Sequence, residues 1–254
     1  MRTYRKDLLE FEVFATRDEM GAKAASDAEA CIRRLLEQKD EINIVFAAAP
    51  SQNDFLKYLS KKDIEWSRIN AFHMDEYIGL AQDAPQGFGN FLAAGIFDLV
   101  PFKSVNYIYS NTETPEQICA RYEKLLADRD IDIVFMGIGE NGHIAFNDPH
   151  VCLFDDPKGV KVVSLDRRCR QQQVNDGCFK TLEDVPEYAI TLTVPTLMRG
   201  KYLFVMVPTE LKAEAIGKVF SGEITEQCPA SILRAHKNAV LYTDEAGAKF
   251  LGKQ

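Results

Sequence analysis

Short apolar segments alternate along this chain with longer segments whose apolar residues recur at helical spacing. Residues 42–48 (INIVFAA) are apolar almost throughout, which is typical of a parallel strand buried on both faces. Residues 18–38 precede them with the apolar spacing of a helix, and Asp18 is placed to cap its start. Because strands that alternate with helices pair in parallel through right-handed crossovers, the pattern predicts an open, mostly parallel α/β sheet with helices on both faces.

The same alternation continues towards the C-terminus. Further strands are expected at 70–74, near Tyr107, and at 131–136, 160–164, 189–193, 202–207 and 239–242. Further helices are expected from the caps at 51–54 to about Leu59, at 87–99, 114–128 and 210–220, and from about Asp244 onwards. With 254 residues and 46% hydrophobic composition, we expect residues 1–254 to form a single domain.

Net charge and cysteine spacing limit the classes of partner. The chain carries a net charge of −8 and no run of Lys or Arg, so we expect no nucleic acid and no membrane surface as a partner. Its six cysteines are scattered without a CxxC pair, which is typical of reduced thiols in a cytoplasmic protein. The N-terminus lacks an apolar signal core, and no stretch of about 18 apolar residues occurs, so an intracellular protein is expected.

Ligands of parallel sheets bind beyond the C-terminal ends of the strands. The loops that follow the strands ending near Ala48, Met74, Met136 and Val207 should therefore converge on one crevice. Since the net charge is negative, an anionic ligand in this crevice must be held by local cations and backbone amides.

Residues 135–149 (FMGIGENGHIAFNDP) concentrate chemistry at one of these strand ends. The glycines let backbone N–H groups approach a ligand, and imidazole and carboxylate groups such as those of His143 and Asp148 can move protons. A lone histidine is more often a buried structural residue, but the glycines and Asp148 favour catalysis. The segment GIGENG at 137–142 formally matches the GxGxxG fingerprint of dinucleotide-binding proteins. However, it lies late in the chain, and no sequence with helical spacing follows it. A turn whose backbone approaches a phosphate is therefore favoured over a dinucleotide site.

A metal site is the weaker alternative for this segment. His143, Asp148 and His150 could in principle be ligands. Their spacing matches no regular zinc pattern and no cysteine completes the set, so we expect no metal.

Four further residues have both a structural and a functional interpretation. Asp75 and Glu76 follow a strand and could start a helix, but neighbouring side chains on a strand point apart, so one of them can enter the crevice. Ser51 follows the strand at 42–48 and can be an ordinary helix cap or a phosphate ligand. Lys212 can be a surface lysine or the cation that complements a phosphate.

Two segments resemble the glucosamine-6-phosphate deaminase (isomerase) family, which is related to the 6-phosphogluconolactonases. They are MDEYIGL at 74–80 and GIGENGHIAFNDP at 137–149, and the lactonases typically differ at both. The resemblance implies a Rossmann-like fold and a deaminase-type hydrolase that isomerises a small-molecule amino-sugar phosphate and releases ammonia, with no nucleotide, metal or other cofactor. It implies catalytic roles for Asp75 as the base and for His143 in ring opening, aided by Asn141 and Asp148. It also implies that Ser51, Gly137 and Lys212 bind the substrate phosphate.

The chain departs from the family pattern at several of these positions. Asn141 replaces a common aspartate, and Asp148 replaces the usual glutamate. Pro50-Ser51 replaces a Gly-Gly-Thr type of loop, and Gln173 stands near an expected arginine, for which Arg168 or Arg170 could compensate. The epimer of the substrate therefore stays open, as do lactone hydrolysis and binding without catalysis. The sequence also leaves room for a homo-oligomer.

Overall fold

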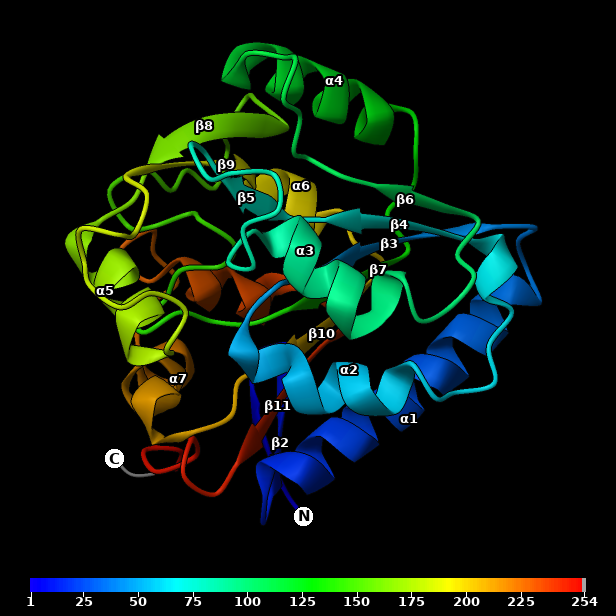
Figure 1. Ribbon diagram of the computed structural model, residues 1–254. Helices are drawn as coiled ribbons and strands as arrows, with labels where there is room; N and C mark the ends of the chain where they lie inside the picture. The colour runs from blue at the N-terminus through cyan, green and yellow to red at the C-terminus, as the bar shows by residue number, and fades with distance from the viewer. Residues whose placement is uncertain (253–254) are drawn as a thin grey trace.

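The computed structural model describes residues 1–252 and contains an eight-stranded sheet (Figure 1). Its strands lie in the order β1 (Arg2–Lys6), β2 (Leu9–Phe14), β11 (Ala239–Asp244), β10 (Tyr202–Met206), β7 (Ile133–Met136), β3 (Ile42–Phe46), β4 (Ile69–His73) and β6 (Ser104–Asn106). All neighbouring pairs are parallel except the β1–β2 hairpin. The predicted α/β class with a mostly parallel sheet is confirmed.

Both faces of the central strands are buried, because successive side chains point to opposite sides. Ile133 and Phe135 of β7 belong to one core, whereas Val134 and Met136 belong to the other. The first core is covered by α1 (Arg17–Leu36), α2 (Asn53–Leu59) and α3 (Phe88–Leu92), which continues as a π-helical turn at Ala93–Phe97. The second is covered by α4 (Pro115–Ala127), α6 (Val194–Met198) and α7 (Ala213–Ser221). Helices therefore cover both faces, as the alternating sequence predicts.

The connections diverge between β3 and β7. From β3 the chain moves outwards to β4 and β6, and it returns through α4 to place β7 on the other side of β3. At such a switch point the loops after the two strands turn away from each other and leave a crevice at the strand ends. The crevice in this molecule is lined by residues 47–51 and 137–139, which follow β3 and β7.

A second, antiparallel sheet lies beside this crevice. It consists of β5 (Asp75–Tyr77), β9 (Tyr188–Leu192) and β8 (Val160–Ser164), in that order. Only Met74 separates β4 from β5, so the chain passes almost directly from one sheet to the other. Asp75 is paired with Thr191 of β9, and this pairing fixes the backbone that carries the acidic pair.

Some elements differ from those predicted. The strands β1, β2 and β5 and the helices α5 (Arg167–Asn175) and α6 were not predicted. Short 3₁₀ segments lie at Pro50–Gln52, Trp66–Arg68, Glu210–Lys212 and Pro229–Ala235.

The helix expected from Asp244 was wrong, because residues 245–252 form turns. The Asp244 side chain accepts a hydrogen bond from the Gly247 N–H at 2.8 Å, and this contact starts a turn in place of a helix.

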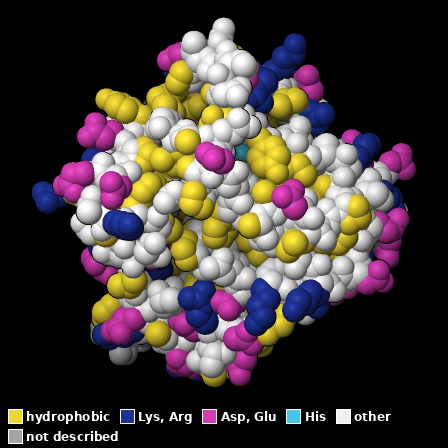
Figure 2. All heavy atoms as spheres, viewed as in Figure 1, with side chains coloured by type: hydrophobic (Ala, Val, Ile, Leu, Met, Phe, Trp, Pro, Cys, Tyr) yellow, Lys and Arg dark blue, Asp and Glu magenta, His cyan; other side chains and the backbone are white. Residues whose placement is uncertain are grey.

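Within residues 1–252, no helix combines the length and the apolar character needed to cross a bilayer. On the face shown in Figure 2, Lys and Arg side chains alternate with Asp and Glu side chains around the rim. That face carries no continuous basic surface.

Candidate active site

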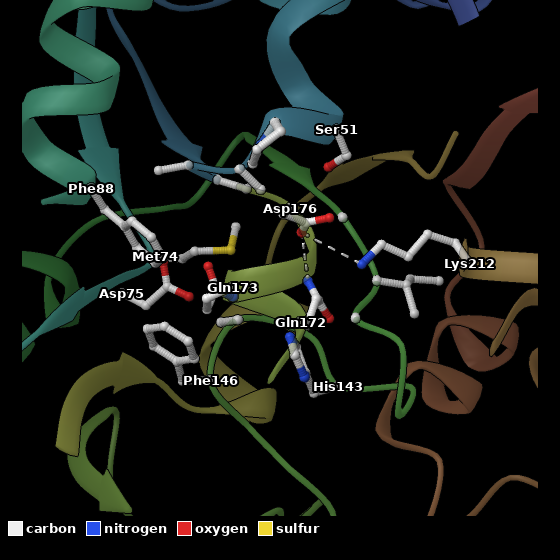
Figure 3. A pocket seen from close by; sticks show the side chains of 18 of the residues that line it. Ser51, Met74, Asp75, Phe88, His143, Phe146, Gln172, Gln173, Asp176 and Lys212 are labelled. Carbon is white, nitrogen blue, oxygen red and sulfur yellow. Dashed lines mark hydrogen bonds and ion pairs between the residues drawn. The ribbon is translucent and has the colours of Figure 1, made fainter. Parts of the chain in front are cut away.

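The four predicted loops meet at one cavity beside the switch point (Figure 3). Residues that follow β3, β4, β7 and β10 line it together with the helix α5 and the segment that contains His143. Its polar and charged lining residues are Arg17, Ser51, Asp75, His143, Gln172, Gln173, Asp176, Thr209 and Lys212. Segments that are far apart in the sequence thus bring cations, carboxylates and an imidazole to one small volume.

Five of the seven predicted site residues line this cavity: Ser51, Asp75, Gly137, His143 and Lys212. The other two, Asn141 and Asp148, do not line it. They lie behind His143, where they contact its ring or its backbone. They can therefore position the imidazole but do not themselves face the space that a ligand would occupy.

The imidazole of His143 is held from behind by a buried carboxylate. Its Nδ1 lies 3.0 Å from Oδ1 of Asp148, a residue with no solvent exposure. Asn141 donates to the same oxygen at 2.9 Å and to Asp166 at 2.9 Å, and its own oxygen accepts from the His143 backbone N–H at 3.1 Å. Burial alone would raise the pKa of Asp148, but the facing imidazole and the Asn141 amide lower it below its usual value. Asp148 therefore stays ionised, and Nε2 is the nitrogen left for a ligand.

Asp75 and Glu76 have different roles, as the alternation along a strand predicts. Asp75 faces the cavity, whereas Glu76 accepts hydrogen bonds at 2.9 Å from the backbone N–H groups of Tyr77, Phe88 and Gly89. Glu76 thereby caps the start of α3. Burial, reinforced by the charge of Glu76, raises the pKa of Asp75 well above its usual value. Asp75 is consequently suited to accept and return a proton.

A second histidine fixes the backbone of Asp75. The Nδ1 atom of His73 lies 2.9 Å from the Asp75 carbonyl oxygen, and Nε2 accepts from the Ile108 N–H at 2.9 Å. Burial lowers the pKa of His73 to about 4, so the ring is neutral with its proton on Nδ1. His73 is thus a structural residue of the core.

Lys212 is a buried cation without a hydrogen-bond partner among the described residues. Its side chain is only 5% exposed, and its Nζ lies 3.9 Å from Oδ2 of Asp176, beyond hydrogen-bond distance. Burial lowers the pKa of Lys212, and Asp176 opposes this effect. An ammonium group that is unsatisfied in a buried position is costly unless a ligand completes it. This geometry favours a polar or anionic ligand over a surface role for Lys212.

Backbone geometry beside the cavity is unusual at two residues that are not glycines. Thr209 has φ of 85° and Ala145 has φ of 48°, and both line the cavity. Such conformations cost about 1–3 kcal/mol each and persist where the surroundings impose them, which is frequent at ligand sites. Thr209 is held by a hydrogen bond from its N–H to Asp244 at 3.0 Å.

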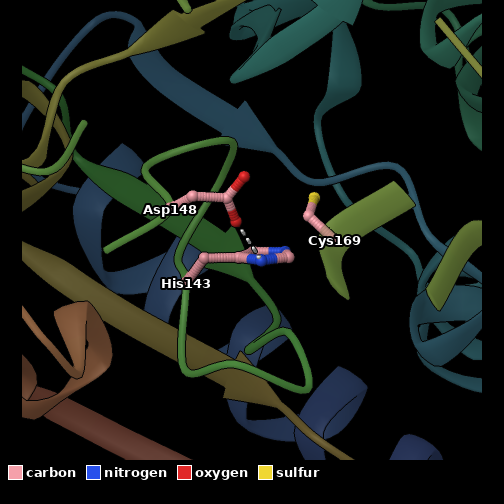
Figure 4. Close-up of side chains that lie close together, drawn as sticks. All are labelled: His143, Asp148 and Cys169. Atoms are coloured by element: carbon pink, nitrogen blue, oxygen red, sulfur yellow. Dashed lines mark ion pairs between the residues drawn. The ribbon is translucent and has the colours of Figure 1, made fainter. Parts of the chain in front are cut away.

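The carboxylate, imidazole and thiol groups of Asp148, His143 and Cys169 form a cluster (Figure 4). Their possible ligand atoms lie within 4.8 Å of one another, while His150 belongs to a different group with Asp148 and Asp166. Burial and the neighbouring carboxylates raise the pKa of Cys169 well above its usual value, so its sulfur is a protonated thiol. The Asp148 carboxylate is already engaged by His143, by Asn141 and by the Asp166 backbone N–H, so this cluster fits a polar support for the imidazole better than a metal centre.

Three lining residues were missed because α5 was not predicted. The sequence analysis does not single out Gln172 or Asp176, and it names Gln173 only through its position in the family pattern. Together with Cys169 they recur at intervals of three and four residues, which places them on one face of a helix. The helical spacing of these positions was the signal that could have found them.

The interpretation that Arg168 or Arg170 replaces the missing arginine was wrong. Arg168 pairs with Glu214, and Arg170 donates to the carbonyl oxygens of Leu182 and Val185. Neither lines the cavity.

Comparisons with known proteins show which family the chain resembles. The sequence model of a family described as glucosamine-6-phosphate isomerases/6-phosphogluconolactonase matches residues 15–242. The glucosamine-6-phosphate deaminase of Exiguobacterium sibiricum is 33% identical over 222 residues, which are 87% of this chain and 86% of that protein. The glucosamine-6-phosphate deaminase of a Bacillus cereus strain is 31% identical over 214 residues, which are 84% and 80% of the two chains.

Solved structures give the same result. The structure of a monomeric glucosamine-6-phosphate deaminase matches with a TM-score of 0.83 and 27% identity, covering 94% of this chain and 99% of that one. A 6-phosphogluconolactonase from Thermotoga maritima matches with a TM-score of 0.74 and 19% identity, covering 94% and 100%. The second similarity establishes a common fold.

The His143 ring occupies the space that a side chain at position 139 would fill. A Cβ at position 139 would lie well inside van der Waals contact of the ring. We expect Gly139→Ala to displace the imidazole from Asp148 and so to raise the pKa of that carboxyl, which carbon NMR titration of the side chain would measure. Gly95→Ala is the control, because a Cβ there would make an ordinary contact at 3.4 Å. An unchanged Asp148 titration in Gly139→Ala would contradict the geometry.

The buried carboxylate of Asp75 should lower stability at neutral pH. Since its pKa is raised in the folded protein, the unfolded state holds the charge more easily, and stability falls as the pH rises above the usual carboxyl value. We expect Asp75→Asn to raise Tm at pH 7, by about 2–4 °C for each kcal/mol by which the free energy of unfolding increases. The difference in Tm between the variant and the wild type should be smaller at pH 5 than at pH 7. A variant that is less stable than the wild type at pH 7 would refute the argument.

Proposed function

This chain belongs to the family of glucosamine-6-phosphate isomerases and 6-phosphogluconolactonases, and from this premise we propose that it is an amino-sugar phosphate isomerase-deaminase. It converts glucosamine 6-phosphate, or a close epimer, and water into the ketose 6-phosphate and ammonia. The observation that carries the proposal is that Asp75, His143 and Lys212, from three distant segments, line one cavity. These are the groups that proton transfer at C1 and C2 and the binding of a distal phosphate require.

Ring opening is the task of His143 in this proposal. The sugar enters as a closed ring, and opening it removes a proton from the anomeric hydroxyl and delivers one to the ring oxygen. Because Nδ1 faces Asp148, Nε2 is the atom that exchanges these protons. Asp148 stabilises the imidazolium form whenever the ring carries two protons. Asn141 holds Asp148 in place and is a positioning residue.

Isomerisation is the task of Asp75. Its carboxylate takes the proton from C2 and returns it to C1 through an enolamine, so that C2 is oxidised and C1 is reduced without an external electron acceptor. The resulting imine at C2 adds water and releases ammonia. A base with a raised pKa is well matched to both halves of this transfer, and such catalysis contributes about 10²–10⁴-fold.

Phosphate recognition is proposed for Ser51, Gly137 and Lys212. All three line the cavity, and Lys212 supplies the positive charge. Ser51 Oγ accepts a hydrogen bond from Gln52 at 2.9 Å, so its own proton is free to point towards a ligand. A Cβ at Gly137 would lie 3.2 Å from Ser51 and Gln52, so glycine leaves room for close approach at this point.

Lactone hydrolysis is the second candidate, because the family includes 6-phosphogluconolactonases. The word hydrolase describes those relatives better, since the deaminase reaction begins with an isomerisation. The relatives at 31–33% identity are named glucosamine-6-phosphate deaminases, whereas the lactonase match has 19% identity. A buried base beside the cavity also has a task in isomerisation and none in simple binding, which argues against a non-catalytic relative.

The compartment and the assembly follow as lesser parts of the proposal. All six cysteines are free, which supports a reducing compartment such as the cytoplasm. The proposed site residues all come from one chain, so a homo-oligomer is not needed to complete the site.

The direct test incubates the protein with glucosamine 6-phosphate and follows ammonia and fructose 6-phosphate. We expect both products in equal amounts from the wild type and a loss of at least about 10²-fold in kcat for Asp75→Asn, since the proton carrier is removed. Turnover of 6-phosphogluconolactone without ammonia from either amino-sugar epimer would assign the chain to the lactonases instead.

Lys212 gives a separate prediction for binding. Lys212→Met keeps the length and burial of the side chain but removes its charge, so the KM for the 6-phosphate should rise by about tenfold or more. The kcat should change much less, because Lys212 lies away from the reacting carbons. Lys218→Met on the exposed side of α7 is the matched control. Equal KM values for Lys212→Met and the wild type would exclude Lys212 from phosphate binding.

A further inference from the structure

The end of the cavity that holds Lys212 also holds a carboxylate. Asp176, at the C-cap of α5, lines the cavity with its Oδ2 3.9 Å from Nζ of Lys212 (Figure 3). The same oxygen accepts a hydrogen bond from Gln172 Nε2 at 3.3 Å, and this bond helps to hold the carboxylate in place. A single ammonium and a single carboxylate therefore face the same space, and their formal charges cancel.

The other cation on the cavity wall is already engaged. Arg17 pairs with the carboxylate of Asp54, and it also donates to the Pro50 carbonyl oxygen at 3.0 Å. Gln172 and Gln173 add amide groups to the wall but no charge. Among the described lining residues, Lys212 is thus the cation left to offset Asp176.

This arrangement weakens the contact of Lys212 with a doubly charged phosphate and gives a hydroxyl group two partners. A phosphate in contact with Lys212 would also lie close to the Asp176 carboxylate, and like charges at such separations reduce affinity. A hydroxyl oxygen at about 2.8 Å from both groups would accept from the ammonium and donate to the carboxylate. The gap of 3.9 Å between Nζ and Oδ2 is consistent with such a bridging group.

We propose that Asp176 makes this end of the site electrically neutral and that the enzyme therefore also deaminates amino sugars with a free C6 hydroxyl. The inference rests on the proposed function for the chemistry at C1 and C2. The additional reaction is amino sugar plus water giving ketose plus ammonia, with the same proton transfer from C2 to C1. The C2–N bond breaks, and the oxygen of water becomes the ketose carbonyl oxygen. Asp176 is the residue that sets the preference between the two substrate classes.

The experiment compares glucosamine with glucosamine 6-phosphate in the wild type and in Asp176→Asn, with ammonia release as the readout. We expect ammonia from both sugars in the wild type. We expect the ratio of kcat/KM for the 6-phosphate to kcat/KM for the free sugar to rise by about tenfold or more in the variant. The rise should come from a lower KM for the 6-phosphate, with kcat nearly unchanged, which a general loss of structure would not produce.

Glu140→Gln is the matched control. Glu140 lies close enough to Lys212 to raise the pKa of that lysine, yet it does not line the cavity. Removing its charge should change the ratio by less than about threefold, since charges that are not in contact contribute little. An equal effect of Glu140→Gln and Asp176→Asn would overturn the specific role of Asp176.

A binding measurement separates this inference from the proposed function. Inorganic phosphate, titrated by calorimetry, should bind Asp176→Asn about tenfold or more tightly than the wild type, and this readout needs no turnover. If the wild type consumes glucosamine 6-phosphate but not glucosamine, or if phosphate binds both proteins equally, the inference fails while the proposed function stands. If neither sugar yields ammonia, the proposed function fails, and the inference of a second substrate fails with it.

Discussion

The parallel pairing of β3 with β7 is the constraint on which the rest of the site depends. Val45 is paired with Val134 and Phe46 with Phe135, and the Ala47 N–H continues the ladder to the Phe135 carbonyl oxygen at 2.9 Å. The segments that follow the two strands then separate, because β3 leads to β4 on one side of the pair and β7 leads towards β10 on the other. The backbone that leaves β3 and the glycines that leave β7 both line the cavity. Ser51 and Gly137 follow these two strand ends directly or within a few residues.

Much of this frame was predictable from the sequence because burial on both faces leaves a strong signal. Residues 42–48 are apolar almost throughout, and β3 occupies 42–46 between two cores. The glycines, His143 and Asp148 follow such a strand directly, so their place at the crevice follows from the rule for parallel sheets. The opposite directions of Asp75 and Glu76 follow from the period of two along a strand, although the three residues of β5 were too few to predict it as a strand.

The side of the cavity formed by α5 was not predictable in the same way. The segment RRCRQQQVN has few apolar residues, so it lacks the apolar stripe that identifies a surface helix. Its orientation is set by tertiary contacts, chiefly the buried Cys169 and the cap in which Asp166 accepts from the Cys169 N–H. The charge of Arg168 and Arg170 favours them in the sequence, whereas in the structure both contact groups outside the cavity. Three of the nine polar and charged residues on the cavity wall, Gln172, Gln173 and Asp176, come from this helix and its C-cap.

The contact between Asp244 and Thr209 has a consequence for how substrate affinity could evolve. Asp244 closes β11, and its Oδ1 accepts from the Thr209 N–H at 3.0 Å and from the Gly247 N–H at 2.8 Å. The strained turn that leads to Lys212 is thus anchored by a strand that contributes no side chain to the cavity wall. Substitutions in the last strand and in the turn behind it could retune ligand recognition from a distance, and a comparison restricted to the wall residues would overlook them.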